Sequence, residues 1–224
     1  MKFTNKELLL FDFDGTLIDS VPDLAIALNH MLTSLNRPIF DENIIRFWVG
    51  NGAHTLVQRA LLGKSEIDEP IDESLFESAL DTFLSYYAKN ACVETSAYPE
   101  VIDTLLTLKE KGYVLAIITN KPYMFIEPIL ESLGIKNLFS LSLGGDSLEE
   151  KKPHPLPLLH ACAKLNIKAE NAIMIGDSKN DILAAHAANI DSIGVSYGYN
   201  YGEAITAYNP KLVVDNFMDL LERF

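Results

Sequence analysis

Six short apolar runs, separated for the most part by helical patterns, constrain the fold of this chain more than any other feature. Gly, Asp or Asn residues bound these runs, and each run is short enough to be a β-strand. Between two of them Val101, Leu105 and Leu108 recur at helical spacing. Such alternation predicts a parallel sheet covered by helices on both faces. The predicted strands are residues 8–13, 114–119, 139–143, 172–175, 193–196 and 212–214.

Residues 18–96 interrupt this alternation, because they carry helical patterns and no convincing strand. The first helix is expected after Ser20, which can cap it, with Asp23 three residues further on. A second helical pattern is broken at Gly50 and Gly52 before it resumes. We therefore predict an α/β fold, in which an all-helical cap domain is inserted after the first strand of a Rossmann-like parallel-sheet core. The core comprises residues 1–17 and 97–224, and the cap comprises residues 18–96.

Charge and hydropathy narrow the classes of partner. The formal net charge is −13 over 224 residues with no Lys/Arg-rich run, so polymeric nucleic acid is not expected as a partner. No apolar stretch approaches the roughly 20 residues of a membrane span, and no membrane association is expected. Acidic residues interrupt the N-terminal apolar run too early for a signal peptide, which indicates a cytoplasmic protein. Monomer and weak homodimer both stay open.

Carboxylates follow the first and the fourth predicted strands. Asp12 and Asp14 stand in Asp-Phe-Asp-Gly-Thr, and Asp177 and Asp181 stand in Gly-Asp-Ser-Lys-Asn-Asp. Taken singly, each motif is more often a solvated turn or a helix cap. Because the carboxyl ends of parallel strands meet at one edge of a sheet, both acid pairs are expected there. Together they predict an oxygen-rich site suited to Mg²⁺.

Two further segments offer groups that can bind an anion. Thr119 and Asn120 end the second predicted strand and precede a helix, so a hydroxyl and backbone N–H groups can face an anion. Lys152 stands before another helix, where a solvated surface lysine is the ordinary interpretation. Acids, a hydroxyl and a lysine at one sheet edge could together bind a small anion with a metal ion.

These four segments, in this order and at strand ends, resemble the four motifs of the haloacid dehalogenase superfamily of phosphohydrolases. The 18–96 insertion is placed like the smaller helical cap of that family. The resemblance implies that Asp12 is the nucleophile and becomes an aspartyl phosphate, while Asp14 protonates the leaving group and then activates water. The matching residues are Asp12, Asp14 and Thr16 in the first motif, Thr119 in the second, Lys152 in the third, and Asp177 and Asp181 in the fourth.

The resemblance also implies the ligands of the site. Thr119, Asn120 and Lys152 would bind the transferred phosphoryl group of a small anionic phosphomonoester. Asp14 would contribute its backbone carbonyl to the metal, and Asp181 would either bind the metal or orient water or Lys152. The full set of residues expected around Mg²⁺ is Asp12, Asp14, Asp177 and Asp181.

Residues 46–53, 144–146 and 195–200 resemble the phosphoglycolate phosphatase branch of that family, which implies hydrolysis of 2-phosphoglycolate to glycolate and phosphate. Substrate choice is then expected from the cap, because the core motifs grip the phosphoryl group that all phosphomonoesters share. The cap residues assigned to this choice are Gly50, Asn51, Gly52 and His54, with Arg46 or Arg59 as the cation for the substrate carboxylate.

Three other functions remain open at this point. A dehalogenase would share the fold and the nucleophile, but it needs no metal and would not need Asp14. A phosphatase or phosphomutase of the same superfamily acting on a sugar phosphate would use the same core motifs. A phospho-accepting receiver module also gathers acids, a threonine and a lysine on a parallel sheet, although it lacks a helical cap after its first strand.

Overall fold

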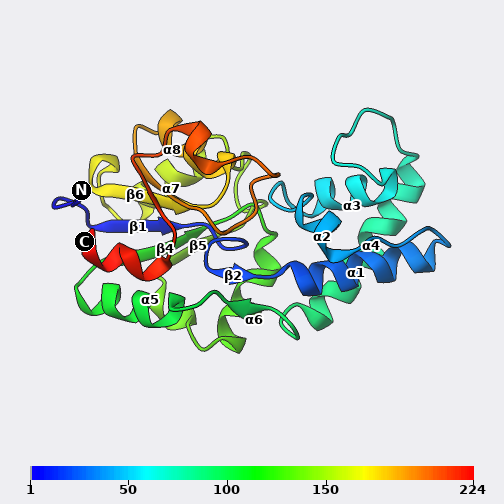
Figure 1. Cartoon of the computed structure of the whole chain (residues 1–224), viewed down its shortest axis with the longest axis horizontal. Helices are drawn as coiled ribbons and strands as arrows, with labels where there is room; N and C mark the ends of the chain where they lie inside the picture. Colours follow the sequence, from blue (N-terminus) through cyan, green and yellow to red (C-terminus); the bar gives the residue numbers. More distant parts are fainter. Residues whose placement is uncertain (1) are drawn as a thin grey trace.

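A six-stranded parallel sheet forms the centre of the computed structural model, which describes residues 2–224 (Figure 1). The strand order is β5-β4-β1-β6-β7-β8, so β1 lies between β4 and β6. Leu10 of β1 is aligned with Ala116 on one side and Met174 on the other. The strands are β1 (Leu8–Phe11), β4 (Val114–Ile118), β5 (Leu141–Leu143), β6 (Ala172–Gly176), β7 (Asp191–Val195) and β8 (Leu212–Val214).

Helices cover both faces of this sheet, as the alternation of elements predicts (Figure 1). Leu8 and Leu10 are buried on the face that α7 (Leu156–Lys164) and α8 (Lys179–Ala187) cover. Leu9 and Phe11 belong to the other core cluster, with α5 (Val101–Glu110) and α6 (Ile126–Ser132). Burial on both faces explains why the strands read as continuous apolar runs. The predicted α/β fold class is confirmed.

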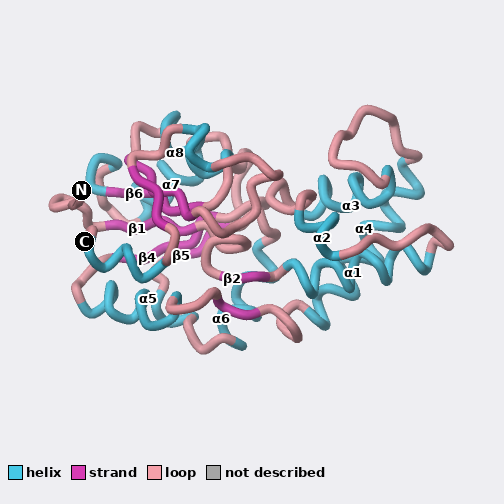
Figure 2. Tube along the Cα trace, in the orientation of Figure 1, coloured by secondary structure: helices cyan, strands magenta, loops and turns pink. Residues whose placement is uncertain are grey.

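Four helices between β2 (Ile18–Asp19) and β3 (Ser96–Ala97) form a separate group beside the carboxyl ends of the sheet strands (Figure 2). Leu28 and Met31 of the first helix are fully buried, as is Phe83 of the last helix, so the group has an apolar centre. Within residues 2–224, none of the helices has both the length and the apolar character needed to cross a bilayer. The four helices are α1 (Val21–Ser34), α2 (Glu42–Arg46), α3 (Ala53–Leu62) and α4 (Glu73–Asn90).

The chain enters and leaves this helical group through a short two-stranded ribbon. β2 (Ile18–Asp19) pairs antiparallel with β3 (Ser96–Ala97). The prediction of an insertion without strands is wrong at these two ends, because two-residue strands are too short to show a period. Ser20 stands at the N-cap position of α1 as expected, but its side chain does not cap the helix. Its hydroxyl donates to Asp14 Oδ1 at 2.6 Å, and no side-chain capping bond forms.

Asp23, on the first turn of α1, ties that helix to the segment that leads out of the helical group. Its buried carboxylate accepts hydrogen bonds from the backbone N–H groups of Val93, Glu94 and Thr95, at 2.9 to 3.1 Å. The Thr95 hydroxyl also donates to it, at 2.7 Å. A buried carboxylate is stabilised by several such donors, and the donors in turn depend on it. Asp23 therefore holds both connections of the helical group together.

Asp23→Ala should lower the free energy of unfolding by about 2 kcal/mol, because it leaves the buried N–H and hydroxyl of Thr95, and the partly buried N–H groups of Val93 and Glu94, without an acceptor. Asp81→Ala is the matched control, since Asp81 is exposed in the middle of α4, and its effect should stay within about 0.5 kcal/mol. Urea unfolding followed by circular dichroism measures both values. Equal effects of the two substitutions would contradict the role assigned to Asp23.

Candidate active site

Three sheet strands carry the central polar residues at their carboxyl ends. Asp12 follows β1, Thr119 follows β4 and Asp177 follows β6, which are the three adjacent strands in the middle of the sheet. The loop after β1 turns at Gly15, which has a φ of +87°. A Cβ atom at Gly15 would collide with Asp177 Oδ2, so glycine lets this loop lie against the Asp177 carboxylate.

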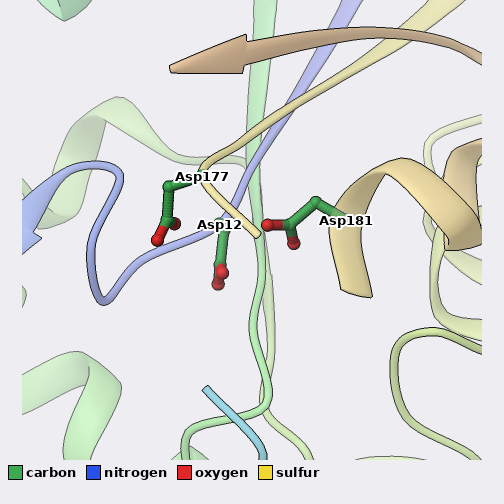
Figure 3. A group of neighbouring side chains, drawn as sticks. All are labelled: Asp12, Asp177 and Asp181. Atoms are coloured by element: carbon green, nitrogen blue, oxygen red, sulfur yellow. The ribbon is translucent and has the colours of Figure 1, made fainter. Parts of the chain in front are cut away.

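Asp12, Asp177 and Asp181 form a compact, buried cluster of carboxylates (Figure 3). One carboxylate oxygen from each lies within 4.8 Å of the others. Burial and the charge of Asp181 raise the pKa of Asp12 to about 7, although Lys152 opposes them. Burial, with Asp12 and Asp181, also raises the pKa of Asp177 well above its usual value. These acids need more positive charge than the side chains supply, so the cluster fits a divalent cation.

Lys152 lies between two of these acids and is the cation within the cluster. Its Nζ is 3.0 Å from Asp12 Oδ1 and 2.6 Å from Asp181 Oδ1, and the side chain is 2% exposed. Burial opposes its charge, but the two carboxylates together raise the pKa of Lys152 above its usual value. The lysine is thus charged and held beside Asp12, so it is not the solvated surface lysine that this sequence context ordinarily indicates.

Asp181 and Asp177 are each held by neighbours through hydrogen bonds. Asp181 Oδ2 accepts from the backbone N–H and the hydroxyl of Ser178, which forms a capping box at the start of α8. Asp177 accepts from the Thr16 hydroxyl through Oδ1 and from the Tyr199 N–H through Oδ2, both at 2.6 Å. Asp181 therefore both takes part in the capping box of α8 and contacts Lys152 in the carboxylate cluster. The sequence motif presented a helix cap and a functional site as alternatives.

Thr119 and Asn120 connect the sheet edge to neighbouring segments. Both are buried, and Asn120 Nδ2 donates to the Lys152 carbonyl at 3.0 Å and to the Gly50 carbonyl at 3.1 Å. Asn120 Oδ1 is buried and has no hydrogen-bond partner within residues 2–224. The Asn120 amide thus joins the segment of Lys152 to a loop of the helical group, and it retains a free acceptor.

Lys121, to which the sequence analysis assigned no role, completes the polar part of the site. Its Nζ lies 3.0 Å from Asp14 Oδ1 and 3.2 Å from Oδ2, and it donates to the Tyr87 hydroxyl at 2.7 Å. Burial opposes its charge, but Asp14 and Tyr87 raise the pKa of Lys121. Its position directly after Thr119 and Asn120, at the end of a predicted strand, is the sequence feature that could have indicated a place in the site. Its partner Tyr87 comes from α4 and could not be inferred from spacing.

The glycine loop of the helical group, residues 50–52, lies against the sheet edge. The side chain of Asn51 does not point into the cavity, as a role in substrate choice would require. Gly50 and Gly52 line the cavity beside Asp12 and Asp14, and a Cβ at Gly52 would lie 2.9 Å from the Asn120 carbonyl oxygen. Asn51 Oδ1 instead accepts from the Tyr201 hydroxyl at 2.7 Å. Its backbone carbonyl accepts from Lys151 Nζ at 2.8 Å. Asn51 therefore anchors the loop, and the structure does not place its side chain in the cavity.

His54, Arg46 and Arg59 also lie away from the cavity lining. The exposed His54 ring packs against Phe76, with 5.4 Å between ring centroids. Arg46 pairs with Asp19 at 3.1 Å and with Glu42 at 2.7 Å. Arg59 donates to the Trp48 and Ser65 carbonyls. Arg46 instead lines a separate cavity with Asp177, and Arg59 lines another with Lys152 and Asn51, so neither arginine lies beside Asp12 and Asp14.

The cavity itself is small and mixed in character. Its volume is about 40 Å³, enough for roughly three water molecules. Apolar side chains of the helical group, with Pro122 and Phe125 just before α6, form much of its wall. The sheet edge supplies the charged groups. The cavity therefore suits a small polar molecule. Besides Gly50, Gly52 and Ala53, the lining residues are Asp12, Asp14, Leu24, Val49, Phe83, Tyr87, Thr119, Asn120, Lys121, Pro122 and Phe125.

Comparison with known proteins gives consistent matches along the chain. Residues 9–195 match the family model of the haloacid dehalogenase-like hydrolases. The phosphoglycolate phosphatase of Colwellia psychrerythraea is 57% identical over 99% of this chain and 98% of its own length. That of Haemophilus influenzae strain 86-028NP is 46% identical over 97% and 98%. The crystal structure of a predicted phosphoglycolate phosphatase from Haemophilus somnus has a TM-score of 0.92 at 42% identity, covering 98% of each chain.

The raised pKa of Asp12 makes the stability of the metal-free protein dependent on pH. Between the ordinary value of 3.8 and about 7, the folded state binds more protons at Asp12 than the unfolded state does. Stability should therefore fall as the pH rises through this range, by up to about 1.4 kcal/mol per pH unit for one proton. Asp12→Asn should show a shallower fall. Urea unfolding in EDTA from pH 4 to 8 measures both slopes, and identical slopes would contradict this interpretation.

Proposed function

The chain belongs to the haloacid dehalogenase-like hydrolase family, and we propose that it is a phosphoric monoester hydrolase that converts 2-phosphoglycolate to glycolate and phosphate. The observation that carries this proposal is the buried cluster in which Lys152 Nζ lies 3.0 Å from Asp12 Oδ1, at the edge of a small cavity. A carboxylate beside a fixed ammonium group can approach a phosphoryl group whose negative charge would otherwise repel it.

Asp12 is the proposed nucleophile. Its Oδ1 accepts from the Phe13 N–H at 2.7 Å and contacts Lys152, so Oδ2 is the oxygen assigned to attack phosphorus. The new bond joins Asp12 Oδ2 to phosphorus as the bond from phosphorus to the leaving oxygen breaks. Asp14 in its acid form gives its proton to that oxygen. It then takes a proton from the water whose oxygen bonds to phosphorus as the bond from Asp12 Oδ2 to phosphorus breaks, which regenerates the acid form for the next cycle. Asp14 lines the same cavity, which supports this assignment.

The remaining side chains neutralise the charge of the phosphoryl group and orient it. Lys152 stabilises the phosphoryl oxygens while Asp181 fixes its position at 2.6 Å. The Thr119 hydroxyl and the Asn120 N–H are assigned to the other phosphoryl oxygens, since both residues line the cavity at the end of β4. These groups bind any phosphomonoester, so they set the reaction and leave the choice of substrate to the cavity wall.

Mg²⁺ is the proposed cofactor, because the three buried carboxylates offer oxygen ligands and lack sufficient positive charge. Asp12 and Asp177 are assigned as carboxylate ligands, with the Asp14 backbone carbonyl beside them. Asp181 is assigned to the same site, where its ion pair with Lys152 and its bonds from Ser178 make orientation its main contribution. When bound, the ion supplies charge neutralisation at the phosphoryl group.

The helical cap argues against the non-enzymatic alternative. Tyr87 and Phe83 from α4, and Gly50 and Gly52 from the loop between α2 and α3, line the cavity together with Asp12 and Asp14. A receiver module must expose its phosphorylated aspartate to partner proteins, whereas a cavity lined partly by a cap suits turnover of a small molecule. The net charge of −13 also disfavours polymeric nucleic acid as the substrate.

A panel of phosphomonoesters tests the proposed substrate. The value of kcat/KM for 2-phosphoglycolate should exceed those for glucose 6-phosphate and p-nitrophenyl phosphate by about tenfold or more. Free phosphate should appear stoichiometrically, and removal of Mg²⁺ with EDTA should abolish its release. Preference for a sugar phosphate would overturn the substrate while leaving the phosphatase activity intact. Transfer of phosphate to a second sugar position, without release, would indicate a mutase.

Asp12→Asn should reduce kcat by several orders of magnitude, because the amide keeps the shape of the side chain and loses the nucleophilic oxygen. Asp103→Asn serves as the control, since Asp103 is exposed on α5 and far along the chain from the site. Circular dichroism must show that both variants are folded. A folded Asp12→Asn protein that retains a tenth of the wild-type kcat would exclude Asp12 as the nucleophile.

A further inference from the structure

Lys121 is the basic residue among the cavity-lining residues within residues 2–224. It follows Asn120 at the end of β4, and its side chain is 3% exposed. Lys152, the other buried lysine of the site, is engaged by Asp12 and Asp181 on the side where the phosphoryl group is expected. Lys121 therefore provides a separate positive charge, on the side of the cavity that faces the cap.

The surroundings of Lys121 combine one acid from the core with one hydroxyl from the cap. Its ammonium group contacts both oxygens of Asp14, at 3.0 and 3.2 Å, and the Tyr87 oxygen at 2.7 Å. Tyr87 uses its oxygen as an acceptor here, so its own hydroxyl hydrogen is left to donate. Burial raises the pKa of Tyr87 to about 12, which keeps that hydrogen in place at neutral pH. The pair therefore presents an ammonium group and an O–H donor side by side.

A substrate whose leaving group carries a carboxylate would meet this pair directly. Asp14 must reach the leaving oxygen to protonate it, and Lys121 Nζ lies 3.0 Å from Asp14 Oδ1. In 2-phosphoglycolate a single CH₂ group separates the leaving oxygen from the carboxylate carbon. Asp14 is assigned to the leaving oxygen and Lys121 lies next to Asp14. The two side chains are thus spaced to contact the leaving oxygen and the carboxylate of the same substrate molecule.

We propose that Lys121 Nζ and the Tyr87 hydroxyl bind the carboxylate of the substrate's leaving group and thereby select 2-phosphoglycolate. This inference rests on the proposed function and names the side chains that determine its specificity. Phe83, Phe125 and Leu24 line the same cavity, so the charged contact forms among apolar groups where it is strong. An analogue without the carboxylate would leave the Lys121 charge shared with Asp14 alone.

This assignment replaces Arg46 and Arg59, the two cap cations that the sequence offered for the same carboxylate if either turned inward. Arg46 is paired with Asp19 and Glu42, and Arg59 donates to two backbone carbonyls. Neither lines the cavity. Because Tyr87 belongs to α4, the proposed contact also makes recognition depend on the position of the cap over the core.

The test compares 2-phosphoglycolate with ethyl phosphate, which keeps the CH₂ group and replaces the carboxylate by a methyl group. The measured quantity is the ratio of the two kcat/KM values. Lys121→Met should lower this ratio roughly 100-fold or more, because a site built for a polar group discriminates strongly through it. Both rates should also fall by a common factor, since Asp14 loses its ion pair, and the ratio cancels that factor. Tyr87→Phe should lower the ratio roughly tenfold.

Arg46→Met is the comparison variant, and it should leave the ratio unchanged. If Lys121→Met lowers both kcat/KM values equally, Lys121 only positions Asp14 and the proposal is overturned. A collapse of the ratio in Arg46→Met would overturn it in favour of the arginine. If Lys121→Met does not fold, Tyr87→Phe and Lys121→Gln decide the question, and unchanged ratios in both folded variants reject the proposal. A wild-type ratio near one would instead reject 2-phosphoglycolate as the substrate.

Discussion

The balance of buried charge at the carboxyl end of β1 is the constraint on which the other features of the site depend. Asp12, Asp177 and Asp181 are buried within reach of one another, and in the part of the chain that the structure describes Lys152 is the one cation paired with them, through Asp12 and Asp181. Such a cluster is costly unless its oxygens are hydrogen-bonded and a cation shares them. The bonds from Thr16, Ser178 and the Tyr199 backbone to these acids meet the first requirement.

The parallel sheet explains how acids from distant parts of the sequence reach one place. Asp12 and Asp177 are separated by 165 positions along the chain, yet β1 and β6 are neighbours in register, with Phe11 beside Ile175. Strand ends are therefore the part of this site that sequence patterns predict well. The apolar run fixes where each strand ends, and parallel topology places the following residues at a common edge.

The contacts across the cap could not be predicted in the same way. Tyr87 reaches Lys121, and Tyr201 reaches Asn51, through side chains whose direction depends on how the helices rotate and settle on the core. A helical pattern shows which face of α4 is apolar, but it does not show what that face meets. Ser20 illustrates a second limit. Its spacing to Asp23 favours a cap, but Asp14 accepts its hydroxyl hydrogen instead.

The ribbon of β2 and β3 has a consequence for how this chain folds. β1 and β4 pair across a separation of roughly 100 residues, and closing so long a loop costs conformational entropy. The helical group packs on itself, with its first helix against its last, and its two ends meet where Ile18 pairs with Ala97. Once it forms, the effective loop between β1 and β4 shortens to residues 12–17 on one side and residues 98–113, which include α5, on the other. Early formation of the helical group would then speed assembly of the sheet, in keeping with the general dependence of folding rate on contact separation.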